Sequence, residues 1–221
     1  MTNFQKVRSQ TVDLCSPLEI EDYQIQPMAD ASPPKWHLAH VTWFFETFVL
    51  AKYSRNHKAF NPVYNYLFNS YYNGVGSPYP RASRGHLSRP TVAEIYEYRK
   101  IIDERVLDLL ETNSDPEIAF RVNLGLHHER QHQELMLTDV KYNFGNNPLL
   151  PSYSSKIENN IGQVLPQKWI EFKGGIAEVG AFYSNDFIFD NETPRHKVFL
   201  APFYFSSHLV TNRDFLEFIQ N

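Results

Sequence analysis

Three features are scarce in this sequence, and each scarcity excludes a class of protein. Cys15 is the single cysteine among 221 residues, so an internal disulfide is excluded. No run of about 18 apolar residues could span a membrane, and the first residues lack the apolar core of a secretory signal. Basic residues number 21 against 25 acidic ones, and the net charge of -4 gives no field that attracts nucleic acid. We therefore expect a cytoplasmic protein with neither a membrane nor a nucleic acid as its partner.

Apolar and aromatic side chains are abundant instead. They make up 42% and 15% of the chain, and the aromatic share is unusually high for a soluble globular protein. The chain can therefore bury a core. Its 221 residues fit one large domain, or one domain with part of another.

Residues 1–150 have the pattern of a mainly α fold, a bundle of four long helices. A stripe of Phe4, Val7 and Cys15 predicts the first helix, and the almost wholly apolar stretch from Trp36 to Phe48 predicts a helix in the middle of the bundle. Helix-start signals lie at Ser16 to Glu19, at Pro33 and Pro34, at Thr91 to Glu94, and at Asp115 and Pro116. The aromatic run from Val63 to Tyr72 predicts a short inserted helix, which could form the wall of a pocket.

The last third of the chain differs in character. Residues 151–167 lie in a stretch rich in Asn, Ser and Pro, which is typical of a linker. Trp169 to Gly180 alternates like two strands around a Gly-Gly turn, two further strands follow around Phe199 and Phe203, and a helix begins at Thr211. About fifty residues are too few for a stable domain. We expect residues 168–221 to be an incomplete α+β segment.

Two histidines on the predicted last helix of the bundle are spaced to share a metal ion. His128 and His132 are four residues apart, so their imidazoles leave the same face of a helix, whereas His127 points about 100° away. The pair also matches the zinc-protease pattern His-Glu-x-x-His. The extended form of that pattern needs Gly and His where this chain has Leu135 and Thr138. A third ligand is therefore expected upstream.

The apolar helix around Trp36 carries the candidates for that third ligand. His37 and His40 both lie within it, and a buried imidazole needs a hydrogen-bond partner or a metal. Either histidine alone is more typical of a satisfied core residue. Beside a metal-spaced pair, however, a third neutral imidazole would complete a site that holds a divalent ion and leaves positions open for reactants.

A loop with Gly and Pro precedes three arginines, Arg81, Arg84 and Arg89. Arginines in a loop are usually solvated. Next to a metal site they are also well suited to clamp the carboxylate of a substrate.

Taken together, these residues resemble a known family. His128, His132 and Glu134, the upstream Leu38-Ala39-His40, and the later Trp-Ile-Glu-Phe-x-Gly-Gly and Asp-Asn-Glu-x-Pro-Arg-His elements are similar to those of the sulfoxide synthases of ergothioneine biosynthesis. That family joins a DinB-like helical bundle to a C-type-lectin-like domain related to formylglycine-generating enzymes. The resemblance covers the whole chain. It implies a metal-binding bundle over residues 1–150, a linker over residues 151–167 and a truncated second domain over residues 168–221.

The resemblance also implies a reaction, a cofactor and residue roles. Members use non-haem Fe(II) and O2 to join a cysteine-type thiol, either cysteine or gamma-glutamylcysteine, to Nα-trimethylhistidine (hercynine), with oxidation of the sulfur to a sulfoxide. The aromatic run is similar to the branch that accepts free cysteine. Carried over by position, the implied ligands are His40, His128 and His132; Glu134 orients a ligand; Tyr71 and Tyr72 line the active site; Arg81 and Arg84 hold the thiol substrate's carboxylate; Gln131 contacts the imidazole of hercynine.

Other functions remain open at this stage. The same three histidines could serve a DinB-like thiol transferase that uses zinc or nickel without O2, or a selenium-carbon bond-forming synthase of the same architecture. A zinc protease is disfavoured because its third ligand is absent. The bundle could also be an inactive metal-binding remnant, because the family's further substrate contacts come from the later part of the second domain.

Overall fold

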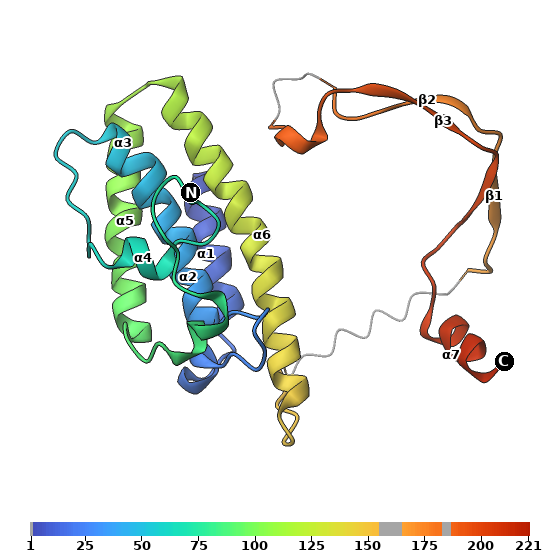
Figure 1. The fold of residues 1–221 in the computed structure, drawn as a ribbon, viewed down its shortest axis with the longest axis horizontal. Helices are drawn as coiled ribbons and strands as arrows, with labels where there is room; N and C mark the ends of the chain where they lie inside the picture. Colours follow the sequence, from blue (N-terminus) through green and yellow to red (C-terminus); the bar gives the residue numbers. More distant parts are fainter. Residues whose placement is uncertain (1, 155–164, 183–186) are drawn as a thin grey trace. The chain divides into compact units, whose positions relative to one another are not determined.

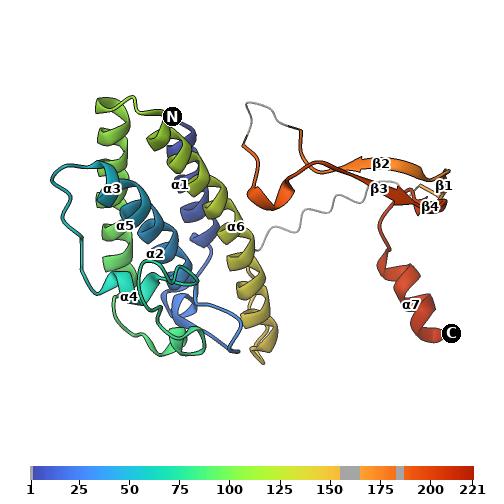
Figure 2. The same cartoon turned by 45° about the horizontal axis from the view of Figure 1, so that its top comes forward.

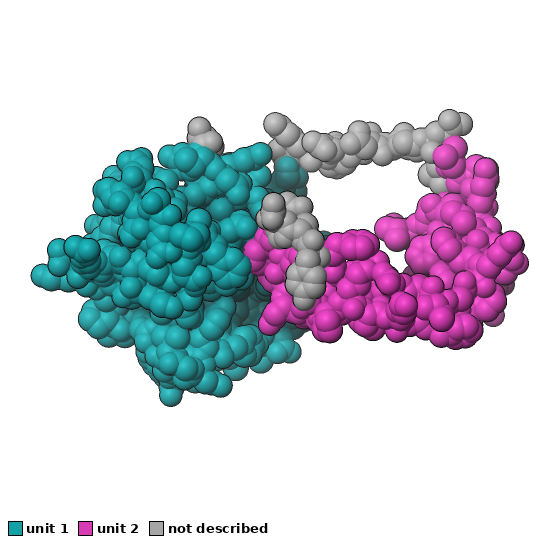
Figure 3. Space-filling model, turned by 90° about the horizontal axis from the view of Figure 1, so that it is seen from above, with its two compact units in different colours: residues 1–157 teal, residues 158–221 magenta. Residues whose placement is uncertain are grey.

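The computed structural model describes residues 2–154, 165–182 and 187–221 of the chain. The chain divides into two compact units, Met1–Ile157 and Glu158–Asn221 (Figure 3). Within the described residues, no helix is both long enough and apolar enough to cross a membrane. Of the expected linker over residues 151–167, residues 155–164 lie outside the described part.

Four long helices form the first unit, and the expected mainly helical fold is confirmed. They are α1 (Asn3–Cys15), α2 (Pro34–Phe45), α5 (Val92–Thr112) and α6 (Pro116–Asn146), and they run side by side (Figure 1). Short helical segments join them: η1 (Ile20–Gln24), the π-helical η2 (Glu46–Leu50), α3 (Ala51–Tyr53), α4 (Tyr64–Phe68) and η3 (Arg81–His86).

Local capping chemistry explains where the long helices begin. Thr91 and Glu94 form a reciprocal capping box at the start of α5. The side chain of Asp115 caps α6, and Pro116 takes the first helical position, where its missing N–H costs nothing. These helix starts agree with the sequence patterns.

Two expectations about short helices are wrong. Ser16 does not start a helix, because its hydroxyl donates to the carbonyl of Asp13 at 2.7 Å and closes the end of α1. The next turn, η1, is capped by Glu19 and Asp22 instead. The aromatic helix is shorter than expected: after α4 the backbone of Asn69 is extended, and its side-chain amide bonds to carbonyls of the following loop.

Helix α2 is the centre of the core. Every residue of this helix is buried, and it packs against both α5 and α6. Gly125 of α6 faces Phe45 of α2 so closely that a Cβ added at this glycine would lie 2.6 Å from the Phe45 ring. The absence of a side chain at Gly125 therefore lets α2 and α6 approach, which brings the histidines of the two helices together.

A buried ion network also fixes α6 within the bundle. Both carboxylate oxygens of Glu129 are used: Oε2 lies 2.8 Å from Nη1 of Arg8, and Oε1 lies 2.9 Å from Nη2 of Arg99 and accepts from the Thr11 hydroxyl at 2.6 Å. Arg8 also pairs with Asp103 at 2.7 Å. Because these residues belong to α1, α5 and α6, the network sets the rotation of α6 about its own axis.

The second unit consists of two antiparallel strand pairs and a helix (Figure 2). Strand β1 (Trp169–Phe172) pairs with β4 (Phe203–Ser206), and β2 (Gly175–Val179) pairs with β3 (His196–Leu200). A short turn, η4 (Asp190–Glu192), precedes β3, and α7 (Asn212–Gln220) ends the unit.

The expected hairpin of β1 with β2 around the Gly-Gly turn is therefore wrong. Gly174 has a φ of +71°, and a Cβ there would lie 2.4 Å from the carbonyl oxygen of Leu200. The glycine accommodates the close passage of another segment instead of closing a turn. The assignment of this unit to a domain of the formylglycine-generating type stays a prediction.

Candidate metal centre

A cavity of about 380 Å³ lies beside α2 and α6 in the first unit. The residues that the family resemblance assigns to the site all line it, except Glu134. Its lining residues are Ser32, Trp36, His37, His40, Ser70, Tyr71, Tyr72, Arg81, Arg84, His128, Gln131, His132 and Leu135.

Three of the histidines converge within this cavity. His40 comes from α2, and His128 and His132 come from successive turns of α6. One ring nitrogen of each lies within 4.8 Å of those of the other two, and Nε2 of His40 is 3.2 Å from Nε2 of His128. Among the described residues, these histidines form the one group of at least three potential ligands that could share a metal ion.

The Nδ1 atoms of the three rings have different surroundings. Nδ1 of His40 donates to the carbonyl of Phe68 at 2.5 Å, which leaves its Nε2 with a lone pair. Nδ1 of His132 lies 2.9 Å from Nδ1 of His37. Nδ1 of His128 is buried and has no hydrogen-bond partner among the described residues.

Burial keeps the three imidazoles neutral. The pKa of His40 and that of His132 fall well below the usual histidine value, because burial disfavours the imidazolium and neighbouring histidines add to the effect. Burial likewise lowers the pKa of His128 to about 4. Neutral imidazole is the form that binds metal, so the three residues fit a divalent ion held by nitrogen. This set of donors suits several transition metals and does not by itself select iron.

Within the part of the chain that the structure describes, Arg84 is a buried cation without a carboxylate partner. Its guanidinium lies 3.4 Å from the centre of the Trp36 ring, Nη1 donates to the hydroxyl of Ser32 at 2.9 Å, and Nη2 donates to that of Ser70 at 3.1 Å. No described residue hydrogen-bonds to its Nε. Burial and the charge of Arg81 lower the pKa of Arg84 to about 10, so it remains charged at neutral pH. Such a group can receive an anion from the cavity.

The remaining lining residues are less enclosed. Arg81 donates to the hydroxyl of Tyr71 at 2.8 Å, and Tyr71 itself is 77% exposed. Tyr72 is half-buried, with its ring against Trp43 and Phe48, and burial raises its pKa. The exposed Gln131, next to His132 on α6, also faces the cavity.

Glu134 is the expected site residue that does not line the cavity. It is exposed, and its side chain makes no hydrogen bond to any of the three histidines, because two positions after His132 an α-helix has turned by about 200°. The groups that contact Nδ1 of His132 and Nδ1 of His40 are His37 and the Phe68 carbonyl. A signal for His37 was present in the sequence, since it precedes His40 by three residues and shares its helix face.

Glu129, the base of the disfavoured protease pattern, lies wholly inside the ion network with Arg8 and Arg99. It is fully buried there and does not line the cavity. It is therefore a structural residue.

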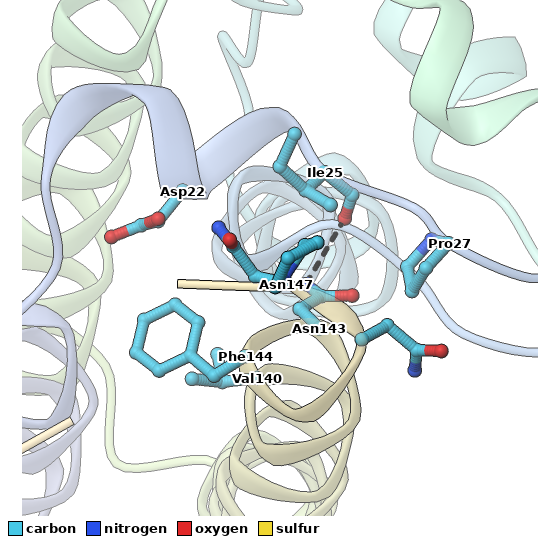
Figure 4. Close-up of a pocket in the computed structure, with 9 residues that line it drawn as sticks. Asp22, Ile25, Pro27, Val140, Asn143, Phe144 and Asn147 are labelled. Atoms are coloured by element: carbon cyan, nitrogen blue, oxygen red, sulfur yellow. Dashed lines mark hydrogen bonds between the residues drawn. The ribbon is translucent and has the colours of Figure 1, made fainter. Parts of the chain in front are cut away.

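A separate cavity of about 340 Å³ lies at the C-terminal end of α6 (Figure 4). Val140, Asn143 and Phe144 of α6 face Ile25 and Pro27 across it, and Asn143 donates to the carbonyl of Ile25 at 3.3 Å. No histidine or cysteine lines this cavity, so it has no set of nitrogen or sulfur ligands for a metal.

The helical bundle and its three-histidine cavity define a class of helical protein with a candidate metal site. The comparison of the sequence with known proteins agrees with this class. Residues 3–136 match the model of the DinB superfamily, so the chain belongs to that superfamily. The chain is also 26% identical over 210 residues to the hercynine oxygenase of Mycolicibacterium thermoresistibile. The matched region covers 92% of this chain and 45% of the relative, so the chain spans about half the length of that protein.

Proposed function

We propose that this chain provides the metal-binding part of a non-haem Fe(II)- and O2-dependent sulfoxide synthase. The reaction would join the sulfur of a cysteine-type thiol, with free cysteine favoured, to C2 of the imidazole of hercynine. The similarity to a hercynine oxygenase over most of this chain supports the proposal. Since the chain spans about half of that relative, the activity is proposed for the protein that contains this chain.

The observation that carries the proposal is the pairing of two features in one cavity. Three neutral histidines offer nitrogen ligands, and the buried Arg84 next to them has no anionic partner in the described structure. A small amino-acid thiol needs both, because its carboxylate requires a cation and its sulfur requires a metal that favours the thiolate. The cavity of about 380 Å³ is within the range of small-molecule sites.

The residues of this chain would have separate roles. His40, His128 and His132 would hold the ion, which when bound supplies activation of the thiol and of O2. Arg84, with Arg81 and Tyr71 at the cavity mouth, would fix the thiol substrate, and Gln131 would contact hercynine. The overall reaction balances: one oxygen atom enters the sulfoxide, and the other leaves as water with the thiol hydrogen and the hydrogen of C2.

The first test is metal content after anaerobic reconstitution with Fe(II). We expect one equivalent in the wild type and in His127→Ala, and loss of binding in His40→Ala, His128→Ala and His132→Ala. Full binding by His40→Ala would refute the site. The second test measures O2 consumption and the mass of the sulfoxide with cysteine and hercynine. An iron-loaded protein that binds both substrates and consumes no O2 would contradict the proposed reaction.

A thiol transferase is the second candidate, and one observation favours it. The family match covers residues 3–136 alone, and the three-nitrogen site accepts zinc or nickel as well as iron. This function predicts transfer of the thiol with zinc under anaerobic conditions. Product formation that requires O2 would exclude it.

A further inference from the structure

A chain of three side chains runs outward from the metal centre. Nδ1 of His132 lies 2.9 Å from Nδ1 of His37, and Nε2 of His37 lies 3.0 Å from Oδ2 of Asp139. The same carboxylate oxygen accepts the backbone N–H of Ser32 at 2.9 Å. His37 is 4% exposed, so water does not replace these contacts.

The direction of each hydrogen bond follows from the chemistry of the groups. Oδ2 of Asp139 accepts the backbone N–H of Ser32 and is therefore an acceptor oxygen, so Nε2 of His37 carries a proton and donates a hydrogen bond to it. In neutral His37 the Nδ1 is then an acceptor. His132 must therefore donate from its own Nδ1, and its Nε2 keeps a lone pair that points away from His37.

We propose that His37 and Asp139 are positioning residues that fix the tautomer and the ring orientation of His132, so that Nε2 of His132 faces the metal. The proposal rests on the three-histidine metal site of the proposed function and on nothing about its substrates. Groups that accept the second ring N–H of a metal-bound histidine typically contribute about 10- to 100-fold to metal affinity.

The geometry separates His37 from a fourth ligand. The nitrogen of His37 that approaches His132 meets its Nδ1, and its other nitrogen is occupied by Asp139. His37 is also outside the group of histidines whose nitrogens lie within 4.8 Å of one another. His37 lies on α2, one turn before His40, and is a neighbour of the ligand His132 on α6 and not of the metal position.

The test compares two substitutions of His37, one that keeps a hydrogen-bond acceptor for His132 and one that removes it. His37→Asn places an amide oxygen where Nδ1 of histidine lies, so it can still accept from His132, whereas His37→Phe fills the space without an acceptor. We expect the dissociation constant for Co(II), followed by its visible absorbance, to rise about 10- to 100-fold in His37→Phe and less than about threefold in His37→Asn. His127→Phe, the same chemical change beside the ligand His128, should leave the constant unchanged.

A spectroscopic measurement separates positioning from simple loss of packing. In the Zn(II)-loaded protein with ¹⁵N-labelled histidine, His132 should have its proton on Nδ1 and His37 its proton on Nε2. Asp139→Leu should remove the fixed proton position of His37 and weaken Co(II) binding, while Asp139→Asn, which keeps an acceptor oxygen, should weaken it less. Thermal unfolding of each metal-free variant identifies any that fail to fold.

The outcomes distinguish this inference from the proposed function. Equal Co(II) affinity in the wild type and in a folded His37→Phe, or equal losses in His37→Phe and His37→Asn, would overturn the positioning role. A His132 proton on Nε2 would overturn it as well. Normal metal binding with the expected pattern of variants, but without any reaction of cysteine with hercynine, would refute the proposed function and leave the inference standing.

Discussion

Four histidines, His37, His40, His128 and His132, are held neutral in one cluster, and this has a consequence for the stability of the protein. His37 and His40 are buried, and His128 and His132 are half-buried. Burial lowers the pKa of each histidine in the folded protein, to about 4 for His128. In the unfolded chain the pKa of each is about 6.5. Below that pH the unfolded state binds more protons than the folded state. The stability of the metal-free protein therefore falls as the pH drops from about 6.5 toward the folded pKa values.

As the pH falls below about 6.5, we expect the metal-free protein to lose up to about 1.4 kcal/mol of unfolding free energy per pH unit for each such histidine. Urea unfolding at pH 7, 6 and 5 measures the slope. His128→Leu should reduce it by one histidine's share, because this position no longer takes up a proton on unfolding. A flat profile between pH 7 and 5 would contradict the neutral cluster.

Arg84 gives the second prediction at this scale. Its planar guanidinium uses both terminal nitrogens on the hydroxyls of Ser32 and Ser70, and an ammonium group cannot reproduce that arrangement. Arg84→Lys should weaken cysteine binding to the iron-loaded protein about 10- to 100-fold, as for the loss of a charged hydrogen bond. Iron content should not change. The control is Arg89→Lys, an exposed arginine in the segment that follows η3.

Calorimetry with cysteine under anaerobic conditions measures the effect, and Tyr71→Phe should lower the affinity in the same direction. Equal loss of iron and of cysteine binding in Arg84→Lys would mean that Arg84 supports the metal site and not the thiol substrate.

Residue spacing predicted part of this site and not the rest. His128 and His132 were found because a helix makes local spacing equivalent to a shared face. His37 was a candidate from its spacing to His40, but its contact with His132 could not be found in this way, nor could that of Arg8 with Glu129, since these pairs lie 95 and 121 residues apart in the chain. Glu134 lies outside the cavity, which its motif did not indicate, because a motif says which residues co-occur and not which face each one occupies.

At the scale of elements, the contact of α2 with α6 depends on Gly125. A Cβ at this position would lie 2.6 Å from Cε1 of Phe45 and 3.1 Å from Cε1 of Phe44. Both rings are buried, and the Phe44 ring also contacts that of His128, with centroids 4.7 Å apart. Strain at this crossing therefore acts on the core and on the metal centre together.

Gly125→Ala should lower the unfolding free energy by about 1–3 kcal/mol, because overpacking outweighs the gain in helix propensity. Gly145→Ala is the matched control. It lies in the same helix with nothing within 4 Å of the added Cβ, so it should be neutral or stabilising by up to about 1 kcal/mol. Urea unfolding of both variants measures the difference, and equal effects would show that the crossing has room for a methyl group.

The beginnings of the long helices were predictable, whereas the strand pairing was not. A cap such as that of Thr91 with Glu94 is written within four residues of sequence. The partner of a strand is set by longer-range contacts: Gly175 pairs with Leu200, and Phe172 with Phe203. The Gly-Gly pair correctly predicted a break between two strands. The prediction that these two strands pair with each other was wrong.

At the scale of the whole molecule, the two units differ in how much they bury. The first unit contains the whole of the buried hydrophobic core, whereas no described residue from 165 to 221 is buried. The strands of the second unit form two-stranded sheets, and such pairs are marginally stable at best in water. Large apolar side chains such as Ile176, Phe199 and Phe218 remain exposed there.

This contrast predicts two levels of protection from hydrogen exchange in this chain. Amides of α2 should open only with the global free energy of unfolding, about 5–15 kcal/mol for a typical domain. Amides in the β1–β4 and β2–β3 pairs should exchange almost as fast as those of an unfolded chain, because little buried surface opposes their opening. Mass spectrometry of peptides covering residues 34–50, 169–179 and 196–206 measures both levels. Fraying at the exposed C-terminal end of α6 provides an internal reference for weakly protected helix. Strong protection of the strand peptides would contradict the prediction. It would mean that the exposed apolar side chains of the second unit are covered in solution and that this burial stabilises the unit.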